Sequence, residues 1–194
     1  MAPIKAANSG HLCTSAVMKT PIGQLQIKAC SLGLHSIAVS KYSRIEGIPL
    51  KRWEADEIEL NRDMIQAENC SEILETTISW IYAYFAGTDA SKPVLCSPVG
   101  QTATLEYWLT AQEKVKFGER VSYGELAYMC NQEKASRAVG NAMRKNPYIL
   151  LVPCHRIVKS DGSLGNYSAG GPAVKEWLLK FELYVLGKLK QDIS

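Results

Sequence analysis

The segment Pro153-Cys154-His155-Arg156 places a nucleophile, a base and a cation next to one another. A cysteine beside a histidine and an arginine sits in an electropositive setting, which favours the thiolate over the thiol. We therefore predict that the pKa of Cys154 lies below the ordinary value of about 8.5 for a thiol. A buried structural cysteine at the end of a strand would show the same local pattern, so other parts of the chain must decide between the two interpretations.

Apolar residues flank this segment on both sides and run from 149 to 158. A continuous apolar run of this length, rich in β-branched residues, predicts a buried strand. Pro153 has no N–H group and so cannot continue a central ladder of hydrogen bonds. We expect an irregular, rigid backbone at this point, which holds Cys154 inside the protein.

The last predicted helix could supply a partner for the histidine. Pro172 suits the first position of a helix, and the apolar side of that helix carries Val174, Trp177, Leu178, Phe181 and Leu186. Glu182 lies four residues after Leu178, close to the same side. A buried carboxylate needs a partner, and the imidazole of His155 could provide it. Cys154, His155 and Glu182 would then act as nucleophile, base and orienting group.

The composition narrows the class of protein. The chain has 194 residues, of which 46% are hydrophobic and 21% charged, as in globular proteins of one ordinary domain or two small ones. It has no apolar run of about 18 residues, which predicts no membrane span, and its start lacks the apolar core of a secretory signal. Six cysteines without such a signal favour a reducing compartment, where cysteines serve as ligands or nucleophiles.

The charge is unevenly placed although the net charge is only +3. Between residues 120 and 159, seven basic side chains face only two acidic ones. Such a window favours a polyanionic partner. A solvated basic surface without any ligand is the alternative that charge alone leaves open.

The first half of the chain predicts strands followed by one helix. Alternating or apolar stretches at 12–19, 23–29 and 34–39 predict strands, and 41–62 is expected to be irregular. A broad apolar stripe predicts a helix over 64–85, ended by Gly87. Residues 86–99 contain two prolines and are expected to connect two domains.

The second half predicts mainly helices. A helix over 102–116 is followed by Ser122 and Glu125, whose spacing is that of a capping box, and by a short helix to about residue 130. A second short helix over 134–145 completes a helix-turn-helix. Its residues Ser136, Ala138 and Gly140 are small enough for a close approach to a groove, and Arg137 and Arg144 are basic. An αα-hairpin without a ligand is the alternative. The fold class is α+β, with domains at 1–97 and 98–194.

Residues 117–182 resemble the active-site domain of the O6-alkylguanine-DNA alkyltransferases, the methylated-DNA–protein-cysteine methyltransferases. The segment 153–156 is the signature of that family. Around it, 137–144, Asn146-Pro147, 165–168 and 175–179 match in order and spacing. The N-terminal part is similar in layout and in a few residues.

The resemblance implies a chemistry for these residues. Cys154 would take the alkyl group from O6 of guanine once and irreversibly, with no organic cofactor. His155 would draw the thiol proton through a water, and Glu182 would hold the imidazole ring. Asn146 would brace this network, and Tyr123 would protonate the leaving base.

The resemblance also implies a partner, which is double-stranded DNA containing O6-alkylguanine. The helix-turn-helix would enter the minor groove, and the target base would be flipped out of the stack. Arg137 would fill the gap, while Tyr123 would press on the phosphate. Along the recognition helix lie Ser136, Ala138, Gly140 and Arg144, and the guanine pocket would be lined by Val152, Met143, Tyr167 and Ser168. Animal members carry a proline at the position of Ile149 that packs on bulky groups, so methyl transfer is expected more than benzyl transfer. We expect a monomer, in the nucleus, without a membrane partner.

A structural zinc is the remaining implication. Cys30 and His35 span a turn between two predicted strands. Some members of the family bind zinc there, and the other matching positions are Cys13 and Cys96. Three cysteines and one histidine form an accepted tetrahedral zinc set.

Two other functions compete with repair. A lesion-binding relative would flip alkylguanine without repairing it, but such relatives replace the nucleophile, usually by tryptophan, and Cys154 is present. A cysteine hydrolase using Cys154, His155 and Glu182 would turn over amides or esters. Such a hydrolase would not need the basic helix pair.

Overall fold

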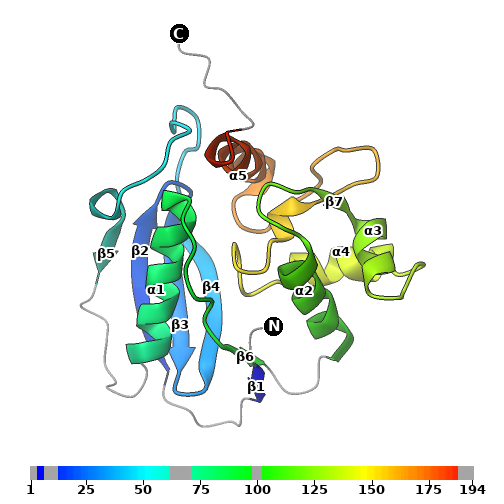
Figure 1. Ribbon diagram of the computed structural model, residues 1–194, viewed down its shortest axis with the longest axis horizontal. Helices are drawn as coiled ribbons and strands as arrows, with labels where there is room; N and C mark the ends of the chain where they lie inside the picture. Colours follow the sequence, from blue (N-terminus) through cyan, green and yellow to red (C-terminus); the bar gives the residue numbers. More distant parts are fainter. Residues whose placement is uncertain (1–3, 7–12, 62–70, 98–101, 188–194) are drawn as a thin grey trace. The chain divides into compact units, whose positions relative to one another are not determined.

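The protein is an α+β chain that divides into two compact units (Figure 1). The computed structural model describes residues 4–6, 13–61, 71–97 and 102–187. The first unit takes in residues 1–48 and 52–100, and the second takes in residues 49–51 and 101–194. Among the described residues, no helix combines the length and the apolar character that crossing a bilayer requires.

A six-stranded sheet forms the first unit, in the order β1-β6-β4-β3-β2-β5. The antiparallel centre consists of β2 (Thr14–Thr20), β3 (Gly23–Cys30) and β4 (Gly33–Tyr42). In β2 and in most of β3, buried residues alternate with more exposed ones, which is the period-two pattern that the sequence shows. The three predicted strands are therefore confirmed.

Three short strands, which no pattern in the sequence predicts, complete the sheet. β5 (Glu59–Asn61) pairs with β2, β6 (Leu95–Ser97) runs parallel to β4, and β1 (Ile4–Ala6) runs parallel to β6. The prediction of an irregular 41–62 was wrong at β5, and the segment 86–99, predicted as a connector, contains β6. Each of these strands has three residues, too few to show a period, and each is specified by the strand it pairs with.

One helix, α1 (Ser71–Ala86), packs against β2, β3 and β4. Its buried residues recur every three or four positions, which gives one apolar side: Leu74, Thr77, Ile78, Ile81, Tyr84 and Phe85. Gly87 follows in the left-handed conformation (φ 70°), as predicted for the end of this helix. The predicted start at 64 lies outside the described residues.

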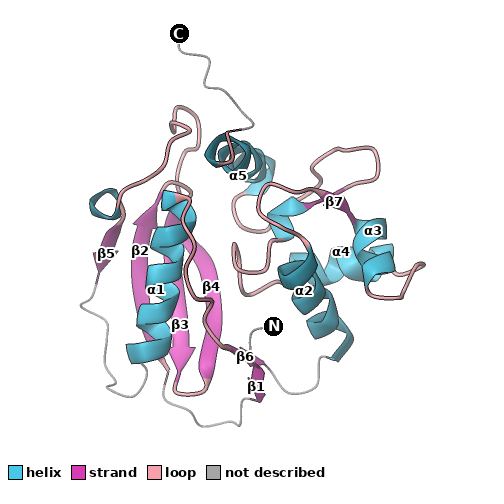
Figure 2. Ribbon diagram, viewed as in Figure 1, coloured by secondary structure: helices cyan, strands magenta, loops and turns pink. Residues whose placement is uncertain are grey.

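The second unit is mainly helical (Figure 2). It contains α2 (Thr102–Lys114), α3 (Tyr123–Met129), α4 (Ser136–Arg144) and α5 (Gly171–Val185). The capping box is confirmed, because Ser122 Oγ accepts from the Glu125 N–H and Glu125 Oε2 accepts from the Ser122 N–H. Helices α3 and α4 pack on each other and on α2, which is the arrangement predicted for the helix-turn-helix.

The predicted strand over 149–158 is wrong for most of its length. Only β8 (Ile157–Val158) is a strand, in a parallel pair with β7 (Val121–Ser122). Residues before it form tight turns, with Leu150 at φ 67° and a hydrogen bond from the Val152 N–H to the Tyr148 carbonyl. The run is apolar because residues 148–158 are buried, and burial alone does not require an extended backbone.

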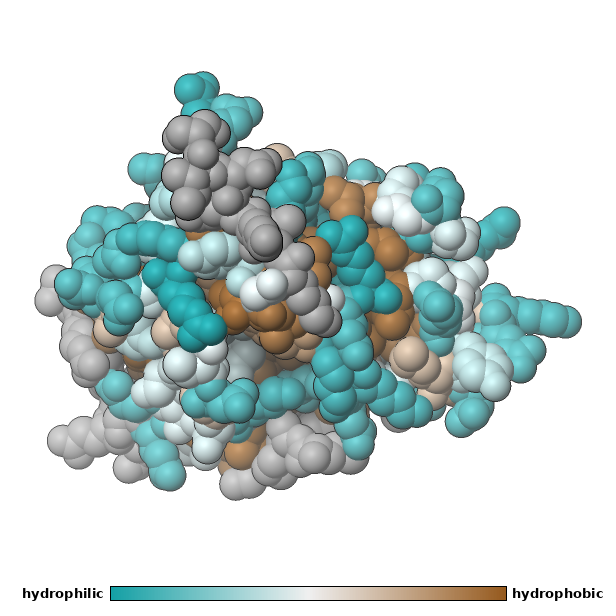
Figure 3. Space-filling view, turned by 45° about the horizontal axis from the view of Figure 1, so that its top comes forward, coloured by the Kyte–Doolittle hydropathy of each residue, from teal (hydrophilic) through white to brown (hydrophobic). Residues whose placement is uncertain are grey.

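Hydrophilic side chains cover most of the face drawn in Figure 3, with apolar side chains between them. Among the described residues, the large hydrophobic side chains that are exposed are Tyr42, Tyr128 and Leu186. The apolar residues of the helices and of the sheet are therefore mostly buried in the cores of the two units.

Candidate active site

Cys154 begins a single turn of 3-10 helix, η3 (Cys154–Arg156), directly after Pro153. Cys154 is almost completely buried, at 4% exposed. Pro153 ends the preceding turns, and the Cys154 N–H donates to the Val152 carbonyl at 2.8 Å. The irregular, rigid backbone expected at the proline is present, and it fixes the direction of the Cys154 side chain.

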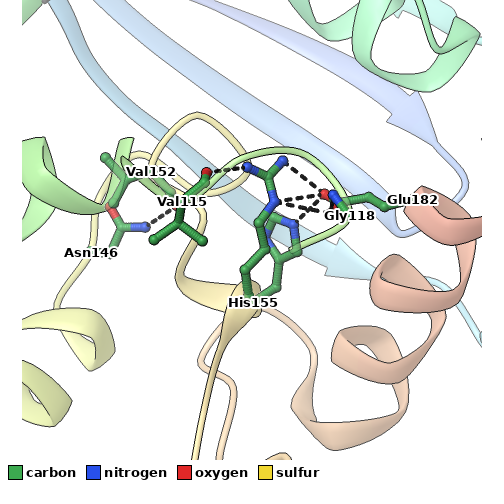
Figure 4. Close-up of polar contacts among 7 residues, drawn as sticks. Val115, Gly118, Asn146, Val152, His155 and Glu182 are labelled. Atoms are coloured by element: carbon green, nitrogen blue, oxygen red, sulfur yellow. Dashed lines mark hydrogen bonds and ion pairs between the residues drawn. The ribbon is translucent and has the colours of Figure 1, made fainter. Parts of the chain in front are cut away.

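Asn146 braces this turn and touches the sulfur. Its Nδ2 donates to Cys154 Sγ at 3.1 Å. The same Nδ2 donates to the Val152 carbonyl at 3.0 Å (Figure 4). Its Oδ1 accepts from the Tyr148 N–H at 2.9 Å. One side chain therefore ties two points of the backbone turn to the thiol.

His155 and Glu182 are both fully buried and meet at 2.7 Å between Nε2 and Oε1 (Figure 4). The pairing proposed from the helical spacing of Glu182 is therefore present. The carboxylate also accepts from the Gly118 N–H at 2.9 Å. Gly118 has φ 75°, a left-handed conformation in which other side chains are strained, so glycine suits this donor position.

Arg156 is a second partner of Glu182. Its Nε and Nη2 donate to the carboxylate at 2.9–3.1 Å, and its Nη1 donates to the Val115 carbonyl at 3.0 Å. Burial acts to raise the pKa of the Glu182 carboxyl, but His155 and Arg156 together lower it to about 2. Glu182 is therefore a carboxylate at every pH at which the protein would work.

The charge state of Glu182 sets the tautomer of His155. Burial lowers the pKa of the imidazole, and this outweighs the raising effect of Glu182. The ring is therefore neutral near pH 7. A carboxylate can only accept, so the ring donates from Nε2 and carries its lone pair on Nδ1. Nδ1 is thus the atom that can take a proton from the thiol.

The predicted lowering of the Cys154 pKa was wrong. Burial raises the pKa of the thiol, and the hydrogen bond from Asn146 and the charge of Lys175 offset only part of that increase. Arg156 does not help because its guanidinium is committed to Glu182 and to Val115. Cys154 therefore rests as a thiol and needs a base.

Lys175 is a residue of the site that the sequence analysis missed. Its side chain is fully buried, and its Nζ donates to the carbonyls of Ile157 and Leu164 and lies 6.0 Å from the centre of the Tyr123 ring. Burial lowers its pKa to about 8, while the charge of Cys154 acts to raise it. Its spacing of seven residues from Glu182 places both on one side of α5, and this signal could have revealed it.

A pocket of about 600 Å³ opens at the thiol. Its lining includes Cys154 and these predicted residues: Tyr123, Gly140, Met143, Arg144, Tyr167 and Ser168. Val152 is not in the lining; it is fully buried and offers its carbonyl to Asn146. A wider depression of about 970 Å³ lies around the turn between α3 and α4, but its described lining contains neither a cysteine nor a histidine.

Helix α4 presents its predicted DNA-binding residues outward. Ser136, Arg137, Ala138 and Arg144 are exposed and Gly140 is half-buried, while Val139, Ala142 and Met143 are buried. A Cβ at Gly140 would stand 3.8 Å from the Tyr123 ring. The basic side of this helix and the pocket of Cys154 therefore adjoin each other within the second unit.

Three of the four predicted metal ligands gather in the first unit. The ligand atoms of Cys30, His35 and Cys96 all lie within 4.8 Å of one another, and the two sulfurs are 3.8 Å apart. Cys13 is exposed and lies outside that group of three. Burial, the hydrogen bond with Cys30 and the nearby charges of Cys30 and Cys13 raise the pKa of Cys96 to about 11. Clustered thiols and an imidazole are a donor set that suits zinc.

Gly33 makes this cluster possible. A Cβ at this position would lie 2.7 Å from the Cys96 N atom and 2.8 Å from the Val94 oxygen. The backbone of β6 can therefore approach the β3–β4 turn only where there is no side chain. The Leu34 N–H then donates to the Val94 carbonyl at 2.8 Å, which brings Cys96 beside Cys30.

A buried cysteine that accepts a hydrogen bond from an asparagine and directly precedes a His–Glu pair, in a unit with a helix-turn-helix, is an arrangement that suits a DNA-binding protein with a cysteine nucleophile. The comparisons agree. Residues 105–184 match the family "6-O-methylguanine DNA methyltransferase, DNA binding domain".

The chain is 39% identical over 173 residues to the methylated-DNA–protein-cysteine methyltransferase of Mus musculus, covering 86% of this chain and 80% of that protein. It is 38% identical over 177 residues to the protein of the same name from Homo sapiens, with 88% and 81% covered. The crystal structure of Mycobacterium tuberculosis OGT in complex with DNA matches with a TM-score of 0.65 at 26% identity, covering 87% of this chain and 92% of that one. The chain belongs to the methylated-DNA–protein-cysteine methyltransferase family.

Proposed function

We propose that this protein repairs duplex DNA by moving the alkyl group of O6-alkylguanine, mainly a methyl group, onto Sγ of Cys154. The observation that carries the proposal is the buried cysteine next to the His155–Glu182 pair, in the lining of a pocket that adjoins a basic recognition helix. In the transfer, the C–O6 bond breaks and an S–C bond forms. The base leaves as guanine, and Cys154 is left as a thioether.

The proton movements follow from the charge states of the side chains. Because the Cys154 pKa is raised, the thiol must lose its proton as it attacks, and Nδ1 of His155 takes that proton through a water. Glu182 stabilises the resulting imidazolium. Burial, and then the charge of Cys154, raise the pKa of Tyr123. Tyr123 therefore keeps its phenolic proton and can give it to the leaving base.

One turnover per molecule is the expected outcome. A thioether is not hydrolysed by an imidazole or a carboxylate, and no other acceptor for the alkyl group takes part in the proposed transfer. Cys154 would remain alkylated after a single reaction. The protein would then be a stoichiometric reagent, and its concentration would limit the number of lesions removed.

The DNA partner follows from the exposed side of α4. The solved relative from Mycobacterium tuberculosis is a complex with DNA. The small residues Ser136, Ala138 and Gly140 would let α4 approach the minor groove, and Arg144 would contact phosphate. Arg137 would fill the space of the flipped nucleotide, since O6 cannot be reached inside a stacked duplex.

The decisive experiment is intact-mass measurement after incubation with duplex DNA that carries one O6-methylguanine. The wild type should gain one methylene unit and saturate at one per chain, and Cys154→Ala should gain none. Cys130→Ser removes another buried cysteine of the same unit and should still accept one methyl group. A wild type that binds this DNA and leaves the lesion intact would instead support the second candidate, a lesion-binding protein.

The Cys30–His35–Cys96 cluster is proposed to hold a structural zinc, with Cys13, the remaining position that the family resemblance implies, as the fourth ligand. The metal would tie the β3–β4 turn to β6 and would take no part in the transfer. Native mass spectrometry should detect one zinc per chain. Cys96→Ser should weaken zinc binding at least about tenfold, while Cys130→Ser should retain it. A wild type that carries no zinc at saturating metal would contradict the site.

A monomer acting in the nucleus is the remaining proposal. The nucleophile, the base and the recognition helix all come from one chain, so no second copy is needed to complete the site. The nuclear location rests on the chromosomal substrate alone. Sedimentation of the purified protein, and imaging of the tagged chain in cells with a nucleus, would test the two parts separately.

A further inference from the structure

The hydroxyl of Tyr167 is a buried polar group that the proposed mechanism does not yet use. The residue is 6% exposed, and its hydroxyl oxygen is buried without a hydrogen-bond partner among the described residues. A phenol can donate one hydrogen bond and accept others. Buried hydroxyls in native proteins nearly always bind a protein group or an ordered water. Since none of the described residues fills this role, an ordered water is a suitable partner for this oxygen.

The position of Tyr167 shows where that partner would lie. The residue sits in the loop before α5, where its carbonyl accepts from the Gly171 N–H at 2.9 Å. Its ring meets the ring of His155 edge to face, with centroids 6.4 Å apart and planes at 73°. It also lines the pocket that contains Cys154. Tyr167 therefore stands beside both the proton donor and the proton acceptor of the transfer.

We propose that the hydroxyl of Tyr167 holds the water molecule through which Cys154 passes its proton to His155. The S–H bond of Cys154 breaks and its proton goes to the water oxygen, while a proton of the same water goes to Nδ1 of His155. Tyr167 keeps its own proton and only fixes the position of the water. It is a positioning residue, and the inference rests on the proposed function.

Two observations favour this water over a contact with the incoming base. The hydroxyl oxygen is shielded from solvent, whereas a base must enter through the open pocket. The ring of Tyr167 packs edge to face on the ring of His155 and lines the same pocket as Cys154, so the phenol lies beside the His155–Glu182 pair as well as beside the pocket. Burial, followed by the charges of Cys154 and Glu182, raises the pKa of Tyr167 well above its ordinary value. The phenol is therefore a donor throughout the reaction.

The test is the pH dependence of single-turnover methyl transfer by Tyr167→Phe at saturating DNA. This change removes one oxygen and keeps the ring against His155. The expected rate is about tenfold lower than that of the wild type near neutral pH, because a lost hydrogen bond to a reacting group has an effect of this order. The difference should shrink as the pH rises and the thiol ionises without a relay. Tyr107→Phe is the matched control, since it removes a buried hydroxyl of the same unit that donates to Gln132, and it should keep the wild-type profile.

Each other outcome overturns the proposal. A wild-type rate and profile in Tyr167→Phe would show that the hydroxyl positions nothing. A loss that is equal at every pH, together with weaker binding of lesion DNA, would place the hydroxyl on the substrate. The pH dependence of Cys154 reactivity can also be measured without DNA, from the rate of its alkylation by iodoacetamide followed by peptide mass. If the wild type transferred no methyl group, the proposed function would fail, yet this second profile would still decide the role of Tyr167.

Discussion

Glu182 receives hydrogen bonds from His155, from Arg156 and from the Gly118 N–H, and its contact with His155 Nε2 is 2.7 Å long. One carboxylate on α5 thus fixes the imidazole, compensates a buried guanidinium and closes the turn after α2. The catalytic geometry and the stability of the second unit depend on the same side chain.

Glu182→Gln should therefore impair stability and transfer together. The substitution keeps the shape but leaves the guanidinium of Arg156 buried without a counter-charge, which costs about 3 kcal/mol of unfolding free energy. Urea denaturation measures this loss. Glu176→Gln is the control on the same helix, because its pair with Lys180 is about half exposed and should contribute less than about 1 kcal/mol. Equal effects of the two changes would refute the central role of Glu182.

Acid should reveal how the unfolding free energy of the wild-type protein depends on the charge of Glu182. The Glu182 pKa is about 2 in the folded state against an ordinary value of 4.5, so the unfolded chain binds this proton more readily. The stabilisation is complete above pH 4.5 and is lost as the pH falls toward 2. Across this window the unfolding free energy of the wild type should fall by about 3 kcal/mol more than that of Glu182→Gln. Parallel curves for the two proteins would contradict the assigned pKa.

The lowered pKa of Lys175 predicts that the unfolding free energy rises with pH in the alkaline range. Its pKa falls from 10.5 to about 8 on folding, because burial makes the protonated amine unfavourable in the folded state. Between pH 8 and 10.5 the folded protein loses this proton before the unfolded chain does, so the unfolding free energy rises with pH. The wild type should gain about 2 kcal/mol relative to Lys175→Met between these two pH values. Lys180→Met, which alters an exposed lysine of α5, should run parallel to the wild type. A wild-type curve parallel to that of Lys175→Met would show that burial does not lower the pKa of this amine.

Asn146→Ala should raise the pKa of the Cys154 thiol further, because it removes the only side-chain donor to Sγ found among the described residues. The rate of methyl transfer should fall about tenfold near neutral pH and recover partly at higher pH. Single-turnover rates over a pH series measure this. Asn141→Ala removes an exposed amide of α4 and should leave the pH profile unchanged. A uniform loss at all pH values would mean that Asn146 acts only on the backbone turn.

Much of the site follows from local patterns in the sequence. The capping box that starts α3 needs only the spacing of Ser122 and Glu125, and it is confirmed. The pairing of Glu182 with His155 followed from a carboxylate on the buried side of a helix, because burial of a charge demands a partner whatever the fold. Both predictions depend on residue spacing within a single helix or turn, so they can be made from the sequence alone.

The direction of a side chain in space was beyond such rules. Arg156 lies two residues from Cys154, yet its guanidinium binds Glu182 and Val115, and the predicted lowering of the thiol pKa failed for that reason. The apolar character of residues 149–152 predicts a strand, but these residues are buried in tight turns instead. Both errors arose where packing between elements, rather than sequence order, sets the outcome.

Arg137 provides a test of base extrusion that is separate from the chemistry. Its side chain is exposed on α4, and under the proposed function it fills the space left by the flipped nucleotide. Arg137→Ala should slow transfer from a duplex about tenfold, because unstacking the base costs a few kcal/mol that the arginine partly offsets. A short single-stranded oligonucleotide with the same lesion has no stack to open, and its rate should not change. Arg144→Ala is the contrasting variant, since loss of a phosphate contact should weaken binding to both substrates and reduce the salt dependence. If Arg137→Ala slowed both substrates equally, the arginine would be a phosphate contact rather than an occupant of the vacated stack.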